Sequence, residues 1–208
     1  MSNLHHIDHP LIRERLSCLR DIGTDSAEFR HQLRAIGRLM VFEATRNFET
    51  RETEIETPLE KTAGAELTRN IILVPILRAG LGMAEGLQQL LPEAAFGHIG
   101  LARNEETLKP DSYYCNLPPD IGEAEVLLVD PMLATGGSAI QATTLLKEKG
   151  AQHLRFVNLV SAPEGIEGFH NAHPEVPIFT AAVDRGLNEV GYIVPGLGDA
   201  GDRYFGTV

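Results

Sequence analysis

The sequence predicts an α/β fold with a parallel β-sheet at its centre and helices on its faces. Continuous apolar runs, such as residues 126–129, are typical of strands that are covered on both faces. Stretches with apolar residues at helical spacing separate these runs. Strands that alternate with helices in this way form parallel sheets with right-handed crossovers.

The first strong helical signal begins at Asp25, and Glu28 three positions later completes a capping pattern. Apolar side chains then recur at helical spacing as far as Phe48. Residues 51–67 differ, because polar and apolar residues alternate there in the stretch ETEIETPLE. This period of two predicts a small exposed β-hairpin outside the main sheet.

The rest of the chain alternates between strand and helix. We expect strands at residues 71–77, 96–101, 126–129, 154–160 and 178–183, and helices at 82–91, 139–149 and 163–172. Ser138 is in position to cap the helix at 139–149, and Gly150 is in position to end it.

Composition limits the class of protein. With 208 residues and 43% hydrophobic content, residues 1–208 can form a single domain around one core. The net charge of −11 argues against nucleic-acid and membrane partners, because those surfaces attract clustered Lys and Arg. No apolar run reaches the roughly 18 residues of a membrane span, and the N-terminus lacks a secretory signal, so we expect a cytoplasmic protein. Cys18 and Cys115 indicate neither a disulfide framework nor a zinc site.

Three expected strands end in residues that can bind phosphate or a sugar. Arg78 follows the first strand, Arg103 the second and Asp130 the third, and the glycine-rich turn ATGGS then leads into a helix. If these strands are neighbours, the residues meet at the carboxyl edge of the sheet, where such folds bind ligands. Helix N-termini and arginines bind phosphate, whereas Asp130 needs hydroxyl groups or a metal ion between itself and phosphate. The site therefore suits a sugar that carries more than one phosphate.

The segment at residues 104–119 is long, polar and interrupted by prolines. These properties are typical of an active-site lid rather than of a tight connection.

Two other motifs carry less weight. GLGDAG, residues 196–201, matches the dinucleotide pattern G-x-G-x-x-G, but only seven residues follow it, which leaves no room for the helix and acidic residue of that motif. HHIDHP, residues 5–10, contains three histidines, but no second ligand set accompanies them, so we expect a solvated terminus rather than a metal site.

Several motifs resemble one enzyme family. DPMLATGGS is similar to the phosphoribosyl-diphosphate loop of type I phosphoribosyltransferases, and PILRAGLGM, RNEET, APEGI and GYIVPGLGDAGDRYFGT together resemble the uracil phosphoribosyltransferase family. The resemblance covers nearly the whole chain. Type I members usually have two adjacent acidic residues where this chain has Asp130 and Pro131, and the uracil branch shares that proline.

The resemblance implies a type I phosphoribosyltransferase fold with N-terminal helices and a small hairpin or hood. The implied reaction moves the phosphoribosyl group of 5-phosphoribosyl 1-diphosphate (PRPP) to N1 of uracil and gives UMP and pyrophosphate. PRPP would be held by Arg78, Arg103, Asp130, Pro131, Met132, Leu133, Ala134, Thr135, Gly136, Gly137, Ser138 and Asp199. Of these, Arg78, Arg103, Asp130 and Asp199 would act in catalysis.

Uracil would contact Tyr192, Ile193, Gly198, Asp199 and Ala200. We expect recognition mainly by backbone, because Tyr192 and Asp199 are the only side chains in GYIVPGLGDAG that can form hydrogen bonds. In this scheme the Ile193 carbonyl accepts from uracil N3–H, and N–H groups of residues 198–200 donate to a uracil carbonyl.

The resemblance further implies a Mg²⁺ ion that arrives on PRPP, with no direct protein ligand and a water-mediated contact to Asp199. It also implies a homo-oligomer, for which the apolar faces of the N-terminal helices would suit a dimer, a GTP effector, and an unusual backbone, such as a cis peptide, near Leu77 and Arg78. Two alternatives stay open at this point. One is a related transferase for another base, and the other is a noncatalytic phosphate-binding regulator.

Overall fold

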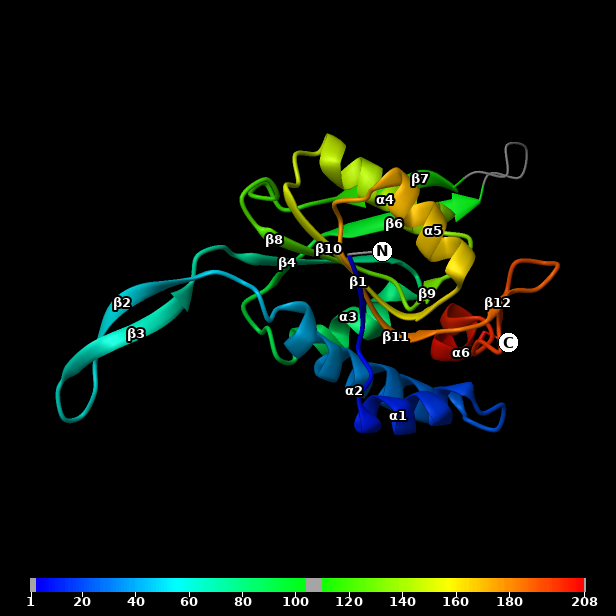
Figure 1. Cartoon of the computed structure of the whole chain (residues 1–208), viewed down its shortest axis with the longest axis horizontal. Helices are drawn as coiled ribbons and strands as arrows, with labels where there is room; N and C mark the ends of the chain where they lie inside the picture. The colour runs from blue at the N-terminus through cyan, green and yellow to red at the C-terminus, as the bar shows by residue number, and fades with distance from the viewer. Residues whose placement is uncertain (1–2, 104–109, 208) are drawn as a thin grey trace.

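The computed structural model describes residues 3–103 and 110–207 of the chain. A central sheet lies between two layers of helices (Figure 1). In chain order the elements are β1 (Leu4–His6), α1 (Pro10–Arg20), α2 (Ser26–Ala44), β2 (Thr50–Glu56), β3 (Lys61–Leu67), β4 (Ile71–Leu77), α3 (Gly80–Gln88), β5 (Ala95–Phe96), β6 (His98–Arg103), β7 (Pro110–Asn116), β8 (Glu125–Val129), β9 (Met132–Leu133), α4 (Gly137–Glu148), β10 (His153–Ser161), α5 (Pro163–Ala172), β11 (Ile178–Val183), β12 (Gly186–Leu187), β13 (Ile193–Val194) and α6 (Ala200–Phe205).

The central sheet has the strand order β1-β11-β10-β8-β4-β6-β7, with the short strands β5 and β9 beside β4 and β10. Neighbours in this order pair in parallel, except for β6 and β7, which are antiparallel. The predicted parallel sheet is therefore confirmed, with one antiparallel strand added at its edge. Because β4 lies between β6 and β8, these three strands end side by side at the carboxyl edge.

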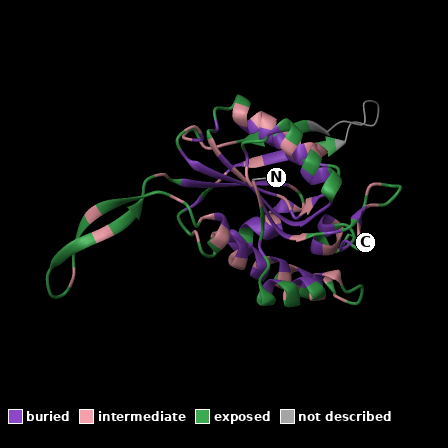
Figure 2. Ribbon diagram, in the orientation of Figure 1, coloured by how far each residue is buried: buried purple, intermediate pink, exposed green. Residues whose placement is uncertain are grey.

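The apolar runs of the sequence arise because helices cover both faces of the sheet. α1, α2 and α3 lie on one face, and α4 and α5 lie on the other (Figure 1). Along β8, Leu127 and Val129 pack into the core cluster that contains α1 to α3, whereas Val126 and Leu128 pack into the cluster that contains α4 and α5. All four side chains are buried (Figure 2), which is why the strand shows no polar alternation.

Two further predictions are confirmed. Helix α2 has Asp25 as its N-cap, and the Asp25 carboxylate accepts a hydrogen bond of 2.9 Å from the Glu28 N–H. Strands β2 and β3 form the expected hairpin, which projects from the body (Figure 1) and exposes most of its side chains (Figure 2). No helix of the described residues is long and apolar enough to cross a bilayer.

The N-terminal segment differs from the expected solvated terminus. Leu4–His6 form β1, which pairs in parallel with β11, and His9 caps α1 by accepting from the Leu11 N–H. The side chains of His5, His6 and His9 are exposed. An edge strand needs only its backbone groups for pairing. The side chains of β1 can therefore be polar, and apolar periodicity does not predict this strand.

The apolar faces of the N-terminal helices pack mainly within this chain. Ile12 and Leu16 of α1 and Leu33 and Ile36 of α2 are buried within this chain, in the core cluster shared with the sheet. Leu11 of α1 and Phe42 of α2 remain exposed, at 47% and 66%, so the apolar surface that these helices offer to a second subunit is on their outer side.

The expected lid, residues 104–119, includes a strand of the main sheet. Residues 104–109 lie outside the described residues. Pro110–Asn116 form β7, which pairs with β6 through a register shift between Gly100 and Leu101. Most of the described part of this segment is thus an edge strand of the main sheet.

Candidate functional site

The carboxyl edge of the central strands gathers the residues that the sequence singled out. Arg78 follows β4, β6 ends at Arg103, and Asp130 follows β8. Since β4 lies between β6 and β8, the predicted convergence of these positions on one rim is confirmed. The peptide bond between Leu77 and Arg78 is cis, as expected, and the Val194–Pro195 bond is also cis.

The glycine-rich turn after β8 presents the start of α4 to this rim. Gly136 has a φ of 86°, a left-handed conformation that glycine adopts readily, and it is the N-cap residue of α4. The expectation that Ser138 caps the helix is therefore wrong, because α4 begins at Gly137 and its cap has no side-chain hydrogen bond. Thr135 and Ser138 are both exposed. Their hydroxyl groups and the first helical N–H groups can bind one anion together.

Residues 131–133, between Asp130 and the glycine-rich turn, attach the turn to the main sheet. Pro131 and Leu133 are buried. The Pro131 carbonyl accepts from the N–H groups of Leu159 and Val160, and Met132 and Leu133 pair with β10 as strand β9. The backbone of this stretch is thus fixed to the sheet, while the exposed hydroxyl groups beyond it face the solvent.

Close packing between α5 and the turn also fixes its position. A Cβ at Gly165, in the first turn of α5, would lie 2.3 Å from the Ala134 carbonyl oxygen and 2.7 Å from that of Leu133. Only glycine allows this approach. The APEGI motif therefore acts from a separate helix to hold the glycine-rich turn in place.

Asp130 is half-buried at the base of the rim. Burial raises the pKa of its carboxyl to about 7, the hydrogen bond of 3.2 Å from the Met132 N–H opposes this rise, and the Asp199 carboxylate adds to it. A carboxylate in this environment is stabilised by any cation or hydroxyl donor that approaches it. The site is therefore complementary to hydroxyl groups or to positive charge.

Asp199 is the N-cap residue of α6, and its carboxylate accepts from the Asp202 N–H at 2.8 Å. The premise that GLGDAG leaves no room for a helix is wrong, because α6 begins at Ala200 within the motif. The helix spans only six residues and is the last element of the chain. The dinucleotide motif requires a longer unit with a further strand, so that interpretation stays rejected.

A cavity of about 260 Å³ joins these two carboxylates. It is lined by Ala79, Asp130, Met132, Ala134, Val190, Gly191, Tyr192, Ile193, Gly198, Asp199, Ala200 and Gly201. The five residues expected to contact uracil therefore share one cavity with Asp130. Sequence reasoning missed Ala79, Val190, Gly191 and Gly201, although each is within two residues of a predicted position.

Arg78 lies on the rim next to α6. Its Nη2 is 3.3 Å from the Asp202 Oδ1, and its guanidinium carbon is 5.6 Å from the centre of the Phe205 ring. The Arg78 side chain is 57% exposed, so it can also reach an anion in the solvent above the rim.

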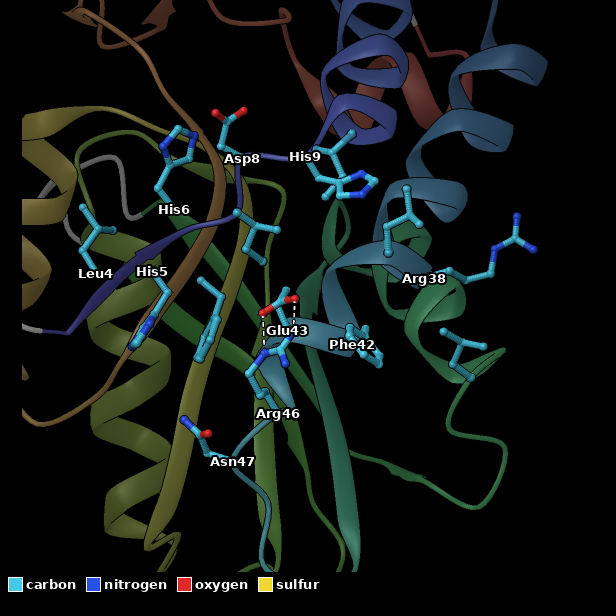
Figure 3. A pocket seen from close by; sticks show the side chains of 15 residues that line it. Leu4, His5, His6, Asp8, His9, Arg38, Phe42, Glu43, Arg46 and Asn47 are labelled. Carbon is cyan, nitrogen blue, oxygen red and sulfur yellow. Dashed lines mark hydrogen bonds and ion pairs between the residues drawn. The ribbon is translucent and has the colours of Figure 1, made fainter.

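A larger cavity lies elsewhere, beside β1 and the C-terminal half of α2. Its volume is about 780 Å³, and Figure 3 shows that Asp8 and Glu43 line it together with Arg38 and Arg46. It shares no lining residue with the smaller cavity. Acidic and basic groups are mixed in its wall, and Glu43 and Arg46 already pair with each other. We therefore place the candidate site at the smaller cavity, where Asp130 of the rim lies together with residues 190–193 and 198–201. Arg78, Thr135 and Ser138 are not among its lining residues.

No three His, Cys, Asp or Glu side chains are grouped closely enough to hold a metal ion within residues 3–103 and 110–207. The donor set of the smaller cavity consists instead of two carboxylates, those of Asp130 and Asp199. Carboxylate oxygens are hard ligands of the kind that Mg²⁺ prefers. They fit a magnesium ion that brings most of its ligands with it as water or phosphate.

Comparison with known proteins points to one family. The model of a family described as uracil phosphoribosyltransferase matches residues 6–207. A relative from Thermoanaerobacter sp. (strain X514), named uracil phosphoribosyltransferase, is 54% identical over 99% of this chain and 98% of its own length.

Solved structures show the same architecture. The structure of the AQ2163 protein from Aquifex aeolicus matches 97% of both chains with a TM-score of 0.91 and 38% identity. Adenine phosphoribosyl transferase from Trypanosoma brucei matches 92% of this chain and 88% of its own with a TM-score of 0.60, and its 15% identity shows a shared fold alone. The expected type I phosphoribosyltransferase fold is confirmed.

Proposed function

The chain belongs to the uracil phosphoribosyltransferase family, and on that premise we propose how its residues divide the work of the reaction. The enzyme is a pentosyltransferase that moves the phosphoribosyl group of PRPP to N1 of uracil and releases pyrophosphate. One observation carries the assignment of the site. A single cavity brings Asp130, next to the phosphate-binding turn, together with the loop expected to contact uracil.

The 5-phosphate of PRPP binds at the start of α4. There the N–H groups of Gly137 and Ser138 have no carbonyl partner within the helix, and the helix dipole favours negative charge. The hydroxyl groups of Thr135 and Ser138 complete the contacts. The positive φ of Gly136 supports this role, because it lets the backbone turn towards the phosphate.

Asp130 binds the ribose. Its carboxylate accepts hydrogen bonds from the ribose hydroxyls, and it stabilises the positive charge that develops on the ring as the bond from C1 to the diphosphate breaks. The raised pKa supports this role, since burial disfavours the ionised carboxylate and these partners would stabilise it.

The diphosphate gains negative charge as it leaves, and Arg78 and Arg103 stabilise it from the rim. Mg²⁺ fits beside them, because Asp130 and Asp199 present carboxylate oxygens to the same cavity. When bound, the ion supplies further neutralisation of the diphosphate charge. Asp199 would contact it through water.

Uracil binds between Tyr192 and the N-terminus of α6. Ile193 and Ala200 are buried beside the cavity and offer only backbone groups for hydrogen bonds. The Ile193 carbonyl accepts from N3–H, and the N–H groups of Gly198 to Ala200 donate to a uracil carbonyl. Ala200 is the first residue of α6, where N–H groups lack helical partners, which supports its role as a donor.

Residues 104–119 close over bound PRPP and keep water away from the ribose. Because β7 is already paired with β6, protection from amide exchange on addition of PRPP and Mg²⁺ should concentrate in peptides that cover residues 104–109. Equal exchange in both states would make the segment a passive connection.

Assembly and regulation extend this proposal. We place the enzyme in the cytoplasm as a homo-oligomer with GTP as an effector. The hairpin of β2 and β3 supports assembly, because it projects from the body and exposes Ile55 and Leu59 at 45% and 94%. Both cysteines are free thiols, which suits a reducing compartment.

Release of pyrophosphate with each nucleobase in turn, with and without Mg²⁺, tests the function. The proposal expects release that depends on uracil and on the metal. Turnover with another base would indicate a related transferase, and binding of PRPP without turnover would indicate a noncatalytic module.

A further inference from the structure

The loop between β13 and α6 is held by two arginines at positions that do not line the cavity. Arg20 Nη1 donates to the Gly196 carbonyl at 2.8 Å, and Arg203 Nη1 donates to the Leu197 carbonyl at 2.9 Å. Gly196 and Leu197 do not line the cavity, whereas Ile193 before them and Gly198 after them do. The arginines therefore fix the stretch of backbone that connects the two parts of the expected uracil contact.

Asp184 closes this arrangement into a ring of hydrogen bonds. It follows β11, and its side chain is 6% exposed. Its Oδ1 accepts from Arg20 Nη2 at 2.6 Å, and its Oδ2 accepts from Arg20 Nη1 and from the Gly196 N–H, each at 2.8 Å. The Asp184 N–H donates to the Ser161 carbonyl at 2.8 Å, which ties the ring to β10 of the main sheet. Both backbone groups of Gly196 are thus bound to side chains that the sheet and α1 hold in place.

Gly196 in turn lies against the carbonyl group proposed to read uracil. Its φ is 60°, and a Cβ at this position would lie 2.1 Å from the Ile193 carbonyl oxygen. Because the two residues are in such close contact, a shift of Gly196 moves the immediate surroundings of the Ile193 carbonyl. The Arg20–Asp184 pair thus holds the residue that packs against that acceptor.

We propose that Arg20 and Asp184 are positioning residues for uracil, which act through Gly196 on the backbone that reads the base. This inference rests on the proposed function. Neither residue lines the cavity. A substitution changes a side chain but leaves the N–H and C=O groups of the backbone in place, apart from proline. Selectivity at a backbone-lined site therefore depends on the side chains that hold the backbone. A fixed ion pair with additional hydrogen bonds can select one arrangement of a loop.

The test compares two variants with a matched control. Asp184→Asn removes the charge that holds Arg20, and Arg20→Lys keeps the charge but loses the forked donors. Glu125→Gln serves as the control, since Glu125 is a buried carboxylate at the start of β8, 3.7 Å from Arg155 and from Arg69. It removes a comparable buried charge at the opposite end of the strand from the site.

The expected result is a rise in the uracil KM of about 10- to 100-fold in both variants, as for other small displacements of a binding group. The preference for uracil over cytosine should fall by a similar factor, while the PRPP KM changes less than about twofold. Glu125→Gln should keep the wild-type uracil KM and selectivity even if its melting temperature falls.

Wild-type uracil KM and selectivity in a folded Asp184→Asn or Arg20→Lys protein would overturn the inference. If Asp184→Asn does not fold, Arg20→Lys carries the test alone. Equal losses for uracil and PRPP would also overturn it, because they indicate a general loss of structure. A wild-type protein that releases no pyrophosphate with uracil would instead refute the proposed function, and the inference with it.

Discussion

Arg78 Nη2 lies 3.3 Å from the Asp202 Oδ1, so a rim arginine and the helix α6 form an ion pair. The pair is exposed, with 57% of the Arg78 side chain and 34% of the Asp202 side chain accessible. Exposed pairs of this kind contribute about 0.2–1 kcal/mol. A diphosphate with higher charge can therefore take the guanidinium away from Asp202 at small cost.

Arg78→Ala and Arg103→Ala should each lower kcat/KM by about 2–4 kcal/mol of transition-state stabilisation, because each removes a donor from the departing diphosphate. Steady-state kinetics with uracil and PRPP measure this effect. Arg51→Ala is a suitable control, since Arg51 pairs with Glu66 on the exposed hairpin.

Asp202→Asn should cause no such loss. It frees Arg78 from its partner, so the PRPP KM should stay the same or fall by up to about fivefold.

Unchanged kinetics in Arg78→Ala or in Arg103→Ala would remove that arginine from the site.

Stability should depend on pH through Asp130. In the folded protein the Asp130 carboxyl has a pKa of about 7, whereas the ordinary pKa of this group is 3.8. Between these values the folded state binds more protons than the unfolded state, so the free energy of unfolding falls as pH rises and levels off above about pH 7. Asp130→Asn removes this contribution.

The free energy of unfolding of Asp130→Asn, relative to wild type, should therefore be about 2–3 kcal/mol more favourable at about pH 8 than at about pH 5. Urea unfolding at both pH values, at one protein concentration, measures the difference. Turnover of uracil by this variant should be nearly abolished. A relative stability that does not change with pH would contradict the burial of an uncompensated charge at Asp130.

The strands and helices of the sheet could be predicted because burial on two faces leaves a direct trace in the sequence. Val126 to Val129 are apolar because helices cover both sides of β8. Strand β1 leaves no such trace, since it pairs through its backbone at the edge. The start of α4 was misplaced because Gly136 caps it by its conformation, while Ser138 has the side chain that a capping pattern favours.

In the candidate site, too, some residues could be predicted from the sequence and others could not. Arg78, Asp130 and the glycine-rich turn follow apolar strands, so the position of each in the sequence indicates the rim. The pair of Arg20 and Asp184 joins residues 164 positions apart. Periodicity and spacing report on neighbours along the chain, so they cannot indicate a contact that only the folded topology creates.

Ala200→Pro tests the backbone contact to uracil. It deletes the Ala200 N–H, and proline is well tolerated at the first position of a helix, so the fold should survive. Loss of one hydrogen bond to the base should cost about 1–3 kcal/mol in kcat/KM for uracil. Ser26→Pro is a suitable control, since it places proline at the first position of α2 and Ser26 does not line the cavity.

A folded Ala200→Pro protein with wild-type uracil KM would show that this N–H does not contact the base. Circular dichroism and the PRPP KM establish whether the fold is intact. A parallel loss for PRPP would point to displacement of Asp199 and would remove the specific role of Ala200.

The ratio of kcat/KM for uracil to that for cytosine in the wild-type protein tests the central claim most directly. Cytosine replaces the N3–H donor by an acceptor and one carbonyl by an amino group, so two backbone contacts in the cavity lose their partners. At about 1–3 kcal/mol for each mismatch, the ratio should be on the order of 10²–10⁴ in favour of uracil. A ratio near one, or a preference for cytosine, would contradict the account.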